Sequence, residues 1–264
     1  MTRWTAGIEY QGSRYSGWQV QVGRPSVQGA LEAALSSVAN HPVATICAGR
    51  TDAGVHALGQ VVHFDSAADR SPYAWLLGSN SRLPPDVAIR WVQPVMGPEN
   101  KSFSARFSAT SRRYRYVIHN DRARSALLAE RATWFAHALD AEAMHTAAQV
   151  LVGEHDFSAF RAAECQSTTP MRKMESIRVW RSGQFVVLDI RANAFLHHMV
   201  RNITGSLLEV GSLRRQTDWI AELLAGRDRS KSGMTAAAQG LYFVGPDYPA
   251  EFGLPVPAEP WFPA

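Results

Sequence analysis

Strand-like and helix-like segments interleave irregularly along both halves of this 264-residue chain, and this order constrains the fold more than any other feature. Two strand-like runs flank Ser182 and Gly183, a pair of residues typical of a hairpin turn. Irregular interleaving with hairpins predicts an α+β fold with a largely antiparallel sheet. The expected strands cover residues 4–10, 43–48, 60–64, 87–92, 113–119, 176–180, 185–191 and 240–244.

Four helices are expected from apolar residues that recur at helical spacing. The first has Pro25 in its first turn and apolar residues from Val27 to Val38. The second, over residues 141–152, is capped by Asp140 and ended by Gly153. Two more cover residues 196–210 and 217–226.

Each half of the chain offers strands flanked by a helix, which predicts two related α+β subdomains over residues 1–105 and 106–264. The shared sheet would leave a cleft between them, and such a cleft is the usual place for a site.

Composition limits the class of protein. Apolar residues make up 46% and charged residues 19% of the chain, enough to close a sizeable core. No apolar run approaches the length of a membrane span, and the N-terminus lacks a signal-peptide pattern, so we expect a cytoplasmic protein without a membrane. Cys47 and Cys165 are far apart in sequence and are expected as reduced thiols without a metal.

Positive charge is clustered in one stretch, although the net charge is only +4. Between residues 101 and 131, only Asp121 and Glu130 oppose a group of basic residues. Arginine suits phosphate oxygens and also stacks on bases, which favours RNA contact over a merely solvated surface. The group consists of Lys101, Arg106, Arg112, Arg113, Arg115, Arg122, Arg124 and Arg131.

The strand RRYRY places two tyrosines on one face and two arginines on the other. Tyr114 and Tyr116 could stack on bases while Arg113 and Arg115 hold phosphates. Two core tyrosines under a charged outer face explain the same pattern equally well.

The segment AGRTDAGVHALGQVVHF places Asp52 in a loop between two apolar strands. Gly49, Gly54 and Gly59 surround it, and glycines let a ligand approach the backbone closely. A loop aspartate is often a turn former, so spacing alone does not establish catalysis. A carboxylate in a cleft needs a positive partner to stay ionised, and Arg50 and the distant Arg201 are the candidates.

The helical segment FLHHMVRN carries Arg201 off the apolar stripe of its helix. His197 and His198 are adjacent and would point about 100° apart on a helix, so they lack the i, i+4 spacing of a metal pair. We interpret them as structural or RNA-facing. The chain has no G-x-S-x-G elbow, P-loop or G-x-G-x-x-G sequence, which removes the usual signatures of serine hydrolases and nucleotide-binding enzymes.

Five separated motifs resemble the tRNA pseudouridine synthase A family in the same order. They are GIEYQGSRYSGWQ, GRTDAGVHALGQVVHF, FSARFSATSRRYRY, NAFLHHMVRN and AAAQGLYFV. The resemblance spans nearly the whole chain, and it is specific because all five motifs agree.

This resemblance implies the pseudouridine synthase fold, a homodimer, and the anticodon stem-loop of tRNA as substrate, with uridines 38, 39 and 40 modified. It implies Asp52 as nucleophile, Tyr114 against the target base and Arg201 paired with the aspartate. Arg50 would lie near the flipped nucleotide, and Leu241 would belong to the apolar floor beneath the base. No cofactor or metal is implied.

Two other classes of protein remain open at this point. An RNA N-glycosidase would also use an aspartate and a flipped base, but it would release free uracil. A non-catalytic RNA-binding module would use only the arginine-rich strand, for which Arg112, Arg113 and Arg115 are the RNA-binding candidates.

Overall fold

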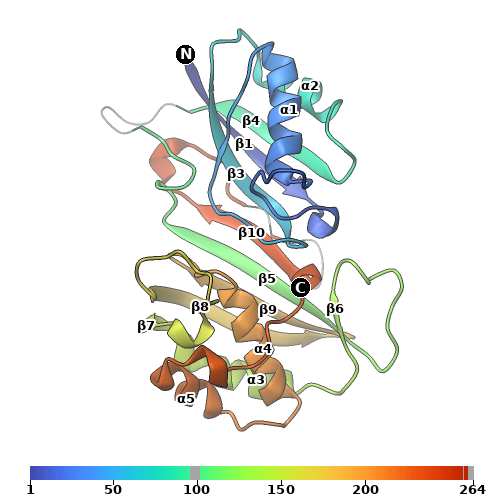
Figure 1. Ribbon diagram of the computed structural model, residues 1–264, viewed down its shortest axis with the longest axis vertical. Coiled ribbons are helices and arrows are strands. Elements are labelled where there is room, and N and C mark those ends of the chain that lie inside the picture. The colour runs from blue at the N-terminus through green and yellow to red at the C-terminus, as the bar shows by residue number, and fades with distance from the viewer. Residues whose placement is uncertain (96–101, 258, 261–264) are drawn as a thin grey trace. The chain divides into compact units, whose positions relative to one another are not determined.

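The computed structural model describes residues 1–95, 102–257 and 259–260 (Figure 1). The strands are β1 (Thr2–Tyr10), β2 (Ile46–Cys47), β3 (His56–Ser66), β4 (Val87–Pro94), β5 (Ser111–Asn120), β6 (Thr133–Phe135), β7 (Gly153–Asp156), β8 (Met171–Ser182), β9 (Phe185–Ala192) and β10 (Leu241–Asp247). The α-helices are α1 (Val27–Ala39), α2 (Pro72–Asn80), α3 (Ala141–Ala148), α4 (Met199–Gly211) and α5 (Trp219–Gly226).

Hydrogen bonds join the strands into a mixed sheet of ten strands. β1 is antiparallel to β3 and β4, while β9 is antiparallel to β5 and β8. β7 is antiparallel to β8, whereas β6 runs parallel to β5. The predicted α+β class with a largely antiparallel sheet is confirmed.

The chain divides into two compact units. Unit 1 contains Met1–Ser111 and Phe243–Glu259, and unit 2 contains Arg112–Tyr242. The predicted ranges, 1–105 and 106–264, assigned the whole second half to one subdomain. The structure differs because most of the last strand returns to unit 1, and a return of this kind leaves no mark in local composition.

The core of unit 1 is built on aromatic residues between the sheet and its helices. Trp75 of α2 is fully buried and packs on Phe64 at 5.1 Å and on Trp4 at 5.9 Å between ring centroids. Trp4 and Phe64 are directly paired across β1 and β3. Helices α1 and α2 pack together beside these strands (Figure 1).

A second aromatic group holds the returning C-terminal segment on unit 1. Phe103 is buried. The centroid of its ring lies 5.1 Å from those of Tyr248 and Phe252, and 6.0 Å from that of His63. His63 accepts a hydrogen bond at Nδ1 from the backbone N–H of Ala105, at 3.0 Å. The segment before β5 and the segment after β10 are therefore fixed to the same part of unit 1.

Unit 2 packs α3 and α4 together and places α3 against β8. A Cβ at Gly211 would lie 2.5 Å from the sulfur of Met144, so glycine at this position lets the Met144 side chain pack directly on the backbone of α4. Asp140 caps α3 by accepting from the N–H of Ala143, as predicted, but the helix ends at Ala148 and Gly153, with a φ of +111°, is the first residue of β7 and not the end of the helix. The last predicted turn of this helix is a 3-10 segment instead, Gln149–Leu151.

Several local predictions were wrong in their details. Pro25 precedes the cap of α1, because Ser26 accepts from the N–H of Gly29 and the helix begins at Val27. The strand expected over residues 43–48 is reduced to Ile46–Cys47. Helix α2 was not predicted, since its apolar residues do not form a regular stripe.

In the part of the chain that the structure describes, no helix combines the length and the apolar character needed to cross a bilayer.

Cys47 and Cys165 are free thiols, and burial raises the pKa of Cys47 to about 12.

The buried His63 makes the stability of the fold depend on pH. Burial lowers its pKa from 6.5 to about 4, with the charge of Arg3 acting in the same direction. The folded state therefore favours the neutral ring, and this contribution is complete above pH 6.5 and is lost as the pH falls toward 4. We expect the free energy of unfolding, measured by urea titration, to fall over this range.

The matched control for this prediction is His63→Asn, whose side-chain oxygen can still accept from Ala105 but does not titrate. Its free energy of unfolding should change less than that of the wild type between pH 6.5 and 4. Equal pH dependence in the two proteins would show that His63 is not the group responsible.

Candidate active-site loop and the residues around it

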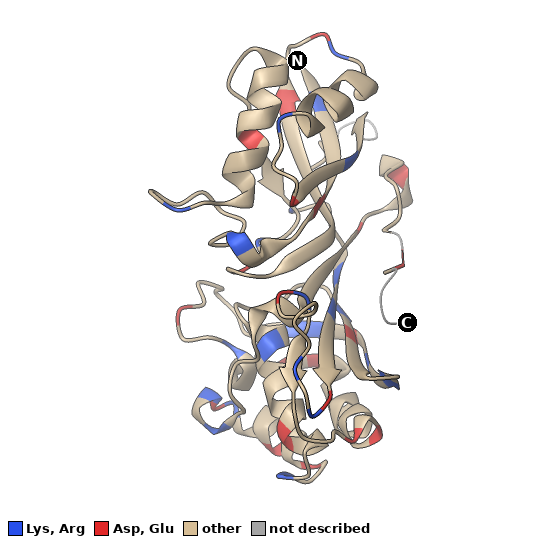
Figure 2. Ribbon diagram, turned by 90° about the vertical axis from the view of Figure 1, so that its right-hand side faces the viewer, with Lys and Arg blue, Asp and Glu red and all other residues tan. Residues whose placement is uncertain are grey.

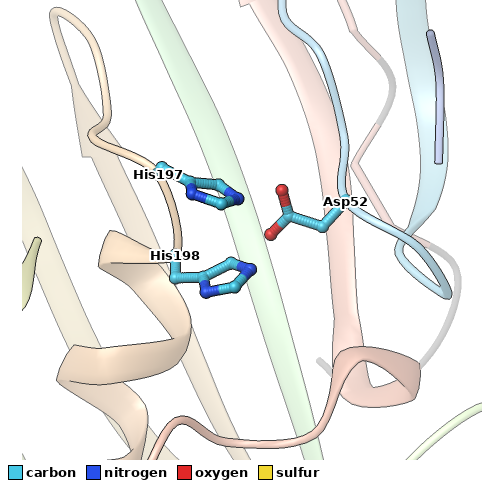
Figure 3. Close-up of side chains that lie close together, drawn as sticks. All are labelled: Asp52, His197 and His198. Carbon is cyan, nitrogen blue, oxygen red and sulfur yellow. The ribbon is translucent and has the colours of Figure 1, made fainter. Parts of the chain in front are cut away.

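Asp52 lies on the loop that joins β2 to β3, and its side chain is half-buried (Figure 3). Arg50 lies on the same loop and is exposed. Gly54, two residues after the aspartate, has a φ of +80°, which favours glycine. The backbone N–H of Val55 donates to the carbonyl of Asp52 at 3.2 Å and closes the turn.

The residue before Asp52 is attached to the buried frame of unit 1. The hydroxyl groups of Thr51 and Tyr10 are hydrogen-bonded at 2.7 Å, and both residues are buried. The carbonyl of Thr51 accepts from the N–H of Trp18 at 3.0 Å. Burial raises the pKa of Tyr10, so its hydroxyl stays protonated in this contact. Thr51 is thus held through both its backbone and its side chain.

The two ends of the loop are held by further buried groups. At the start, Gln60 donates to the carbonyl of Gly49 at 2.5 Å. At the end, the N–H of Gly12 donates to Nδ1 of His56 at 3.0 Å, and a Cβ at Gly12 would lie 1.9 Å from the carbonyl oxygen of Val55. The loop is therefore fixed at its start, its middle and its end.

Gly17 packs against the backbone of the Asp52 loop. Its φ is +98°, and a Cβ there would lie 2.8 Å from the carbonyl oxygen of Thr51 and 3.2 Å from the carbonyl carbon of Asp52. This role of Gly17 was not predicted from the sequence. The sequence feature that corresponds to this role is the pair of glycines, Gly12 and Gly17, that follows the first strand. Their role can be recognised only when their contacts with the Asp52 loop are known.

In unit 2, Tyr114 and Tyr116 occupy one face of β5. Tyr114 is 9% exposed and meets the ring of Phe195 edge-on at 5.0 Å. Tyr116 is fully buried, where its hydroxyl contacts that of Thr133 at 2.6 Å and donates to the carbonyl of Ala237 at 2.7 Å. Tyr116 is therefore a core residue.

The arginines on the other face of β5 are held by an acidic neighbour on β9. Arg113 donates to both carboxylate oxygens of Asp189, at 2.8 and 3.1 Å, and Arg115 donates to one of them at 2.9 Å. The Arg115 side chain is only 5% exposed and lies over the ring of Trp180 at 5.4 Å. Arg115, which the sequence analysis named as an RNA-binding candidate, is thus placed inside the fold.

Other members of the basic group do lie at the surface. Arg106, Arg122, Arg124 and Arg131 are exposed, whereas Arg112 is half-buried and donates to the carbonyl of Asn193 at 2.9 Å. Lys101 lies outside the described residues. Lys and Arg positions occur in both units, so the group between residues 101 and 131 is not the only basic part of the described chain (Figure 2).

Arg201 lies in the first turn of α4 and is half-buried. Its Nε donates to the carbonyl of Ala236 at 2.7 Å. The prediction that His197 and His198 point 100° apart on this helix was wrong, because α4 begins only at Met199. His198 takes a left-handed conformation at the helix entry, and the two rings lie side by side at 4.0 Å between centroids (Figure 3).

Leu241 is the first residue of β10, and it is 5% exposed. The preceding Gly240 lies so close to Tyr116 that a Cβ would be 2.8 Å from its ring. Leu241 is therefore a buried residue that directly follows the close contact between Gly240 and Tyr116.

Comparison with known proteins shows which family has these features. The family described as tRNA pseudouridine synthase matches residues 6–107 and 147–249. The chain belongs to this family of tRNA pseudouridine synthases.

Individual relatives carry a more specific name. A protein named tRNA pseudouridine synthase A from Aeromonas hydrophila is 60% identical over 259 residues, covering 97% of this chain and 95% of the relative. Proteins of the same name from Pectobacterium atrosepticum and Escherichia fergusonii are 57% and 59% identical over 251 residues. These matches cover 95% of this chain and 87% and 92% of the two relatives.

The support that Gly17 gives to the Asp52 loop can be tested by substitution. We expect Gly17→Ala to cost about 1–3 kcal/mol in backbone strain and to displace the loop, and therefore to lower the rate of pseudouridine formation on tRNA. Gly23→Ala is the matched control, because Gly23 also has a positive φ, +71°, but has no atom within 4 Å of the added Cβ. Equal rates for the two variants would show that the contact with the loop does not matter.

Proposed function

We propose that this protein isomerises uridine to pseudouridine at positions 38, 39 and 40 in the anticodon stem-loop of tRNA. The observation that carries the proposal is the Asp52 loop, whose carboxylate is presented on a segment fixed to buried groups on both sides. Identity of about 60% to proteins named tRNA pseudouridine synthase A supports the substrate class.

The proposed reaction breaks the bond from C1′ to N1 of the uracil and forms a bond from C1′ to C5. The C5 proton is lost, and N1 takes up a proton, so atoms and electrons balance without an oxidant or a second substrate. Asp52 acts as the nucleophile, by adding to C6 of the base or by attacking C1′, or it abstracts a sugar proton to give a glycal. Each route uses an ionised carboxylate.

The other proposed residues have supporting roles. Arg201 pairs with the carboxylate and stabilises its charge. Tyr114 contacts the target base by stacking, or accepts the C5 proton at the end of the reaction. Arg50 lies near the flipped nucleotide, and Leu241 contributes an apolar surface beneath the base, which helps to retain the detached uracil.

Stem uridines are paired, so the base has to leave the helix, at a cost of a few kcal/mol. Contacts between arginines and phosphates offset that cost, and each neutralised phosphate makes binding more dependent on salt. Arg112 and Arg113 remain candidates for such contacts. The exposed Arg122, Arg124 and Arg131 are better placed for them than Arg115, whose guanidinium is held inside the fold.

The assembly proposed with this function is a homodimer in the cytoplasm, with tRNA as the partner. Membership of the family supports this part of the proposal. The reaction as written needs no metal and no organic cofactor, because it is an isomerisation in which no group is transferred to another molecule.

The test of this function uses tRNA tritiated at uracil C5, with a single uridine at position 38, 39 or 40 and none elsewhere in the anticodon stem-loop. We expect release of tritium into water from each substrate, because C5 exchanges its hydrogen for the bond to C1′. Release of tritiated uracil instead would identify an RNA N-glycosidase, and binding without any release would identify a non-catalytic RNA-binding module.

The role of Tyr114 can be separated from its packing. Tyr114→Phe keeps the ring and its edge-on contact with Phe195 but removes the hydroxyl. If the hydroxyl takes part in proton transfer, kcat should fall about 10²- to 10⁴-fold while the Kd for tRNA changes little. Turnover close to that of the wild type would leave stacking as the only role of this residue.

A further inference from the structure

The loop that follows α5 folds back onto helix α4 at backbone contact distance. A Cβ at Gly205 would lie 1.7 Å from the carbonyl oxygen of Met234, and a Cβ at Gly233 would lie 2.7 Å from the carbonyl oxygen of Gly205. Glycine is required on both sides of this contact, because any larger residue would separate the loop from the helix.

Asn202 joins the loop to the helix through a fully buried side chain. Its Nδ2 donates to the carbonyl of Phe160 at 2.8 Å. Its Oδ1 accepts from the hydroxyl of Thr235 at 2.7 Å and from Nη2 of Arg229 at 3.1 Å. Both polar atoms of this amide are therefore used, and the orientation of the amide is fixed.

Arg229 closes the same network from the start of the loop. Its Nη1 donates to the hydroxyl of Ser232 at 2.7 Å and to the carbonyl of Gly233 at 3.1 Å. Its Nη2 also donates to the hydroxyl of Thr235 at 3.0 Å. One guanidinium thus holds the beginning and the end of the loop, and Asn202 ties both to α4.

The network ends next to Arg201. Ala236 follows Thr235, and its N–H donates to the carbonyl of Arg201 at 3.1 Å, while its own carbonyl accepts from Nε of Arg201 at 2.7 Å. Tyr116 fixes the next carbonyl, that of Ala237, at 2.7 Å. The Ala236 carbonyl therefore engages Nε and restricts the orientation of the Arg201 guanidinium, whose Nη groups are the donors suited to a carboxylate.

We propose that Asn202, Arg229 and Thr235 are positioning residues that orient the Arg201 guanidinium for its carboxylate partner. The inference rests on the proposed function, in which Arg201 stabilises the charge of the nucleophile. A displacement of about 1 Å in such a group can reduce turnover on the order of 100-fold, so a small change in this loop has a measurable effect.

The test is Thr235→Val, which keeps the shape of the side chain and removes the hydroxyl that donates to Asn202 and accepts from Arg229. We expect kcat to fall about 10-fold or more, with KM for tRNA within about twofold of the wild type. Thr235→Ser restores the hydroxyl and should restore kcat. Thr204→Val is the matched control, because Thr204 is buried in the same helix and its hydroxyl donates to the carbonyl of Val200 within that helix.

A double-mutant cycle shows whether the effect passes through Arg201. In an Arg201→Lys background, measured under single-turnover conditions, Thr235→Val should cause less than about a twofold further loss. An equal loss in both backgrounds would mean that the network only stabilises the fold, and it would overturn the inference. Unchanged kcat for Thr235→Val in the wild-type background would overturn it as well.

The outcomes separate this inference from the proposed function. Tritium release by the wild type tests the function alone. If the wild type releases tritium and Arg201→Lys turns over at the same rate, the function stands while the role of Arg201 and of its positioning residues is rejected.

Discussion

The presentation of Asp52 depends on the attachment of Thr51 to the buried frame of unit 1. The hydroxyl of Tyr10 and the N–H of Trp18 hold this residue from two directions, and Gly17 allows the backbone to approach. Because the anchored residue is adjacent to Asp52, the backbone that carries the carboxylate has little conformational freedom to lose when a substrate binds. The proposed nucleophile is thus carried by a loop that needs no reorganisation before the reaction.

The sequence predicted the parts of the fold whose residues carry a local pattern, such as alternation in a strand or a cap at a helix end. Strand β5, the cap at Asp140 and the turn at Gly183 follow from alternation, capping and turn chemistry, which are local properties. The return of β10 to unit 1 could not be predicted, because it depends on Phe103, Tyr248 and Phe252, which are distant in sequence and meet only in the folded protein. Helix α2 was missed because its single fully buried aromatic, Trp75, gives no periodic pattern.

The candidate site shows the same division. The Gly-rich surroundings of Asp52 were visible in the sequence, whereas the contacts of its loop with Gly12 and Gly17 were not. The alternation of side chains along β5 correctly placed Tyr116 and Arg115 on opposite faces of the strand. It could not show that Asp189, which pairs with Arg115 from β9, would neutralise the charge of the arginines. Nor could it show that Nε of Arg201 donates to the carbonyl of Ala236, 35 residues later in the chain, since hydrogen bonds of this kind have no signature in spacing.

The most direct test of the account compares Asp52→Asn with the wild type on the same tRNA, with the enzyme in excess, by measuring the single-turnover rate of pseudouridine formation together with the Kd. Asparagine keeps the size of the side chain and the backbone contacts of the loop. The account predicts that the rate falls on the order of 10⁴-fold or more, while the Kd and the free energy of unfolding stay close to those of the wild type. A variant that folds, binds tRNA and forms pseudouridine within about tenfold of the wild-type rate would contradict it.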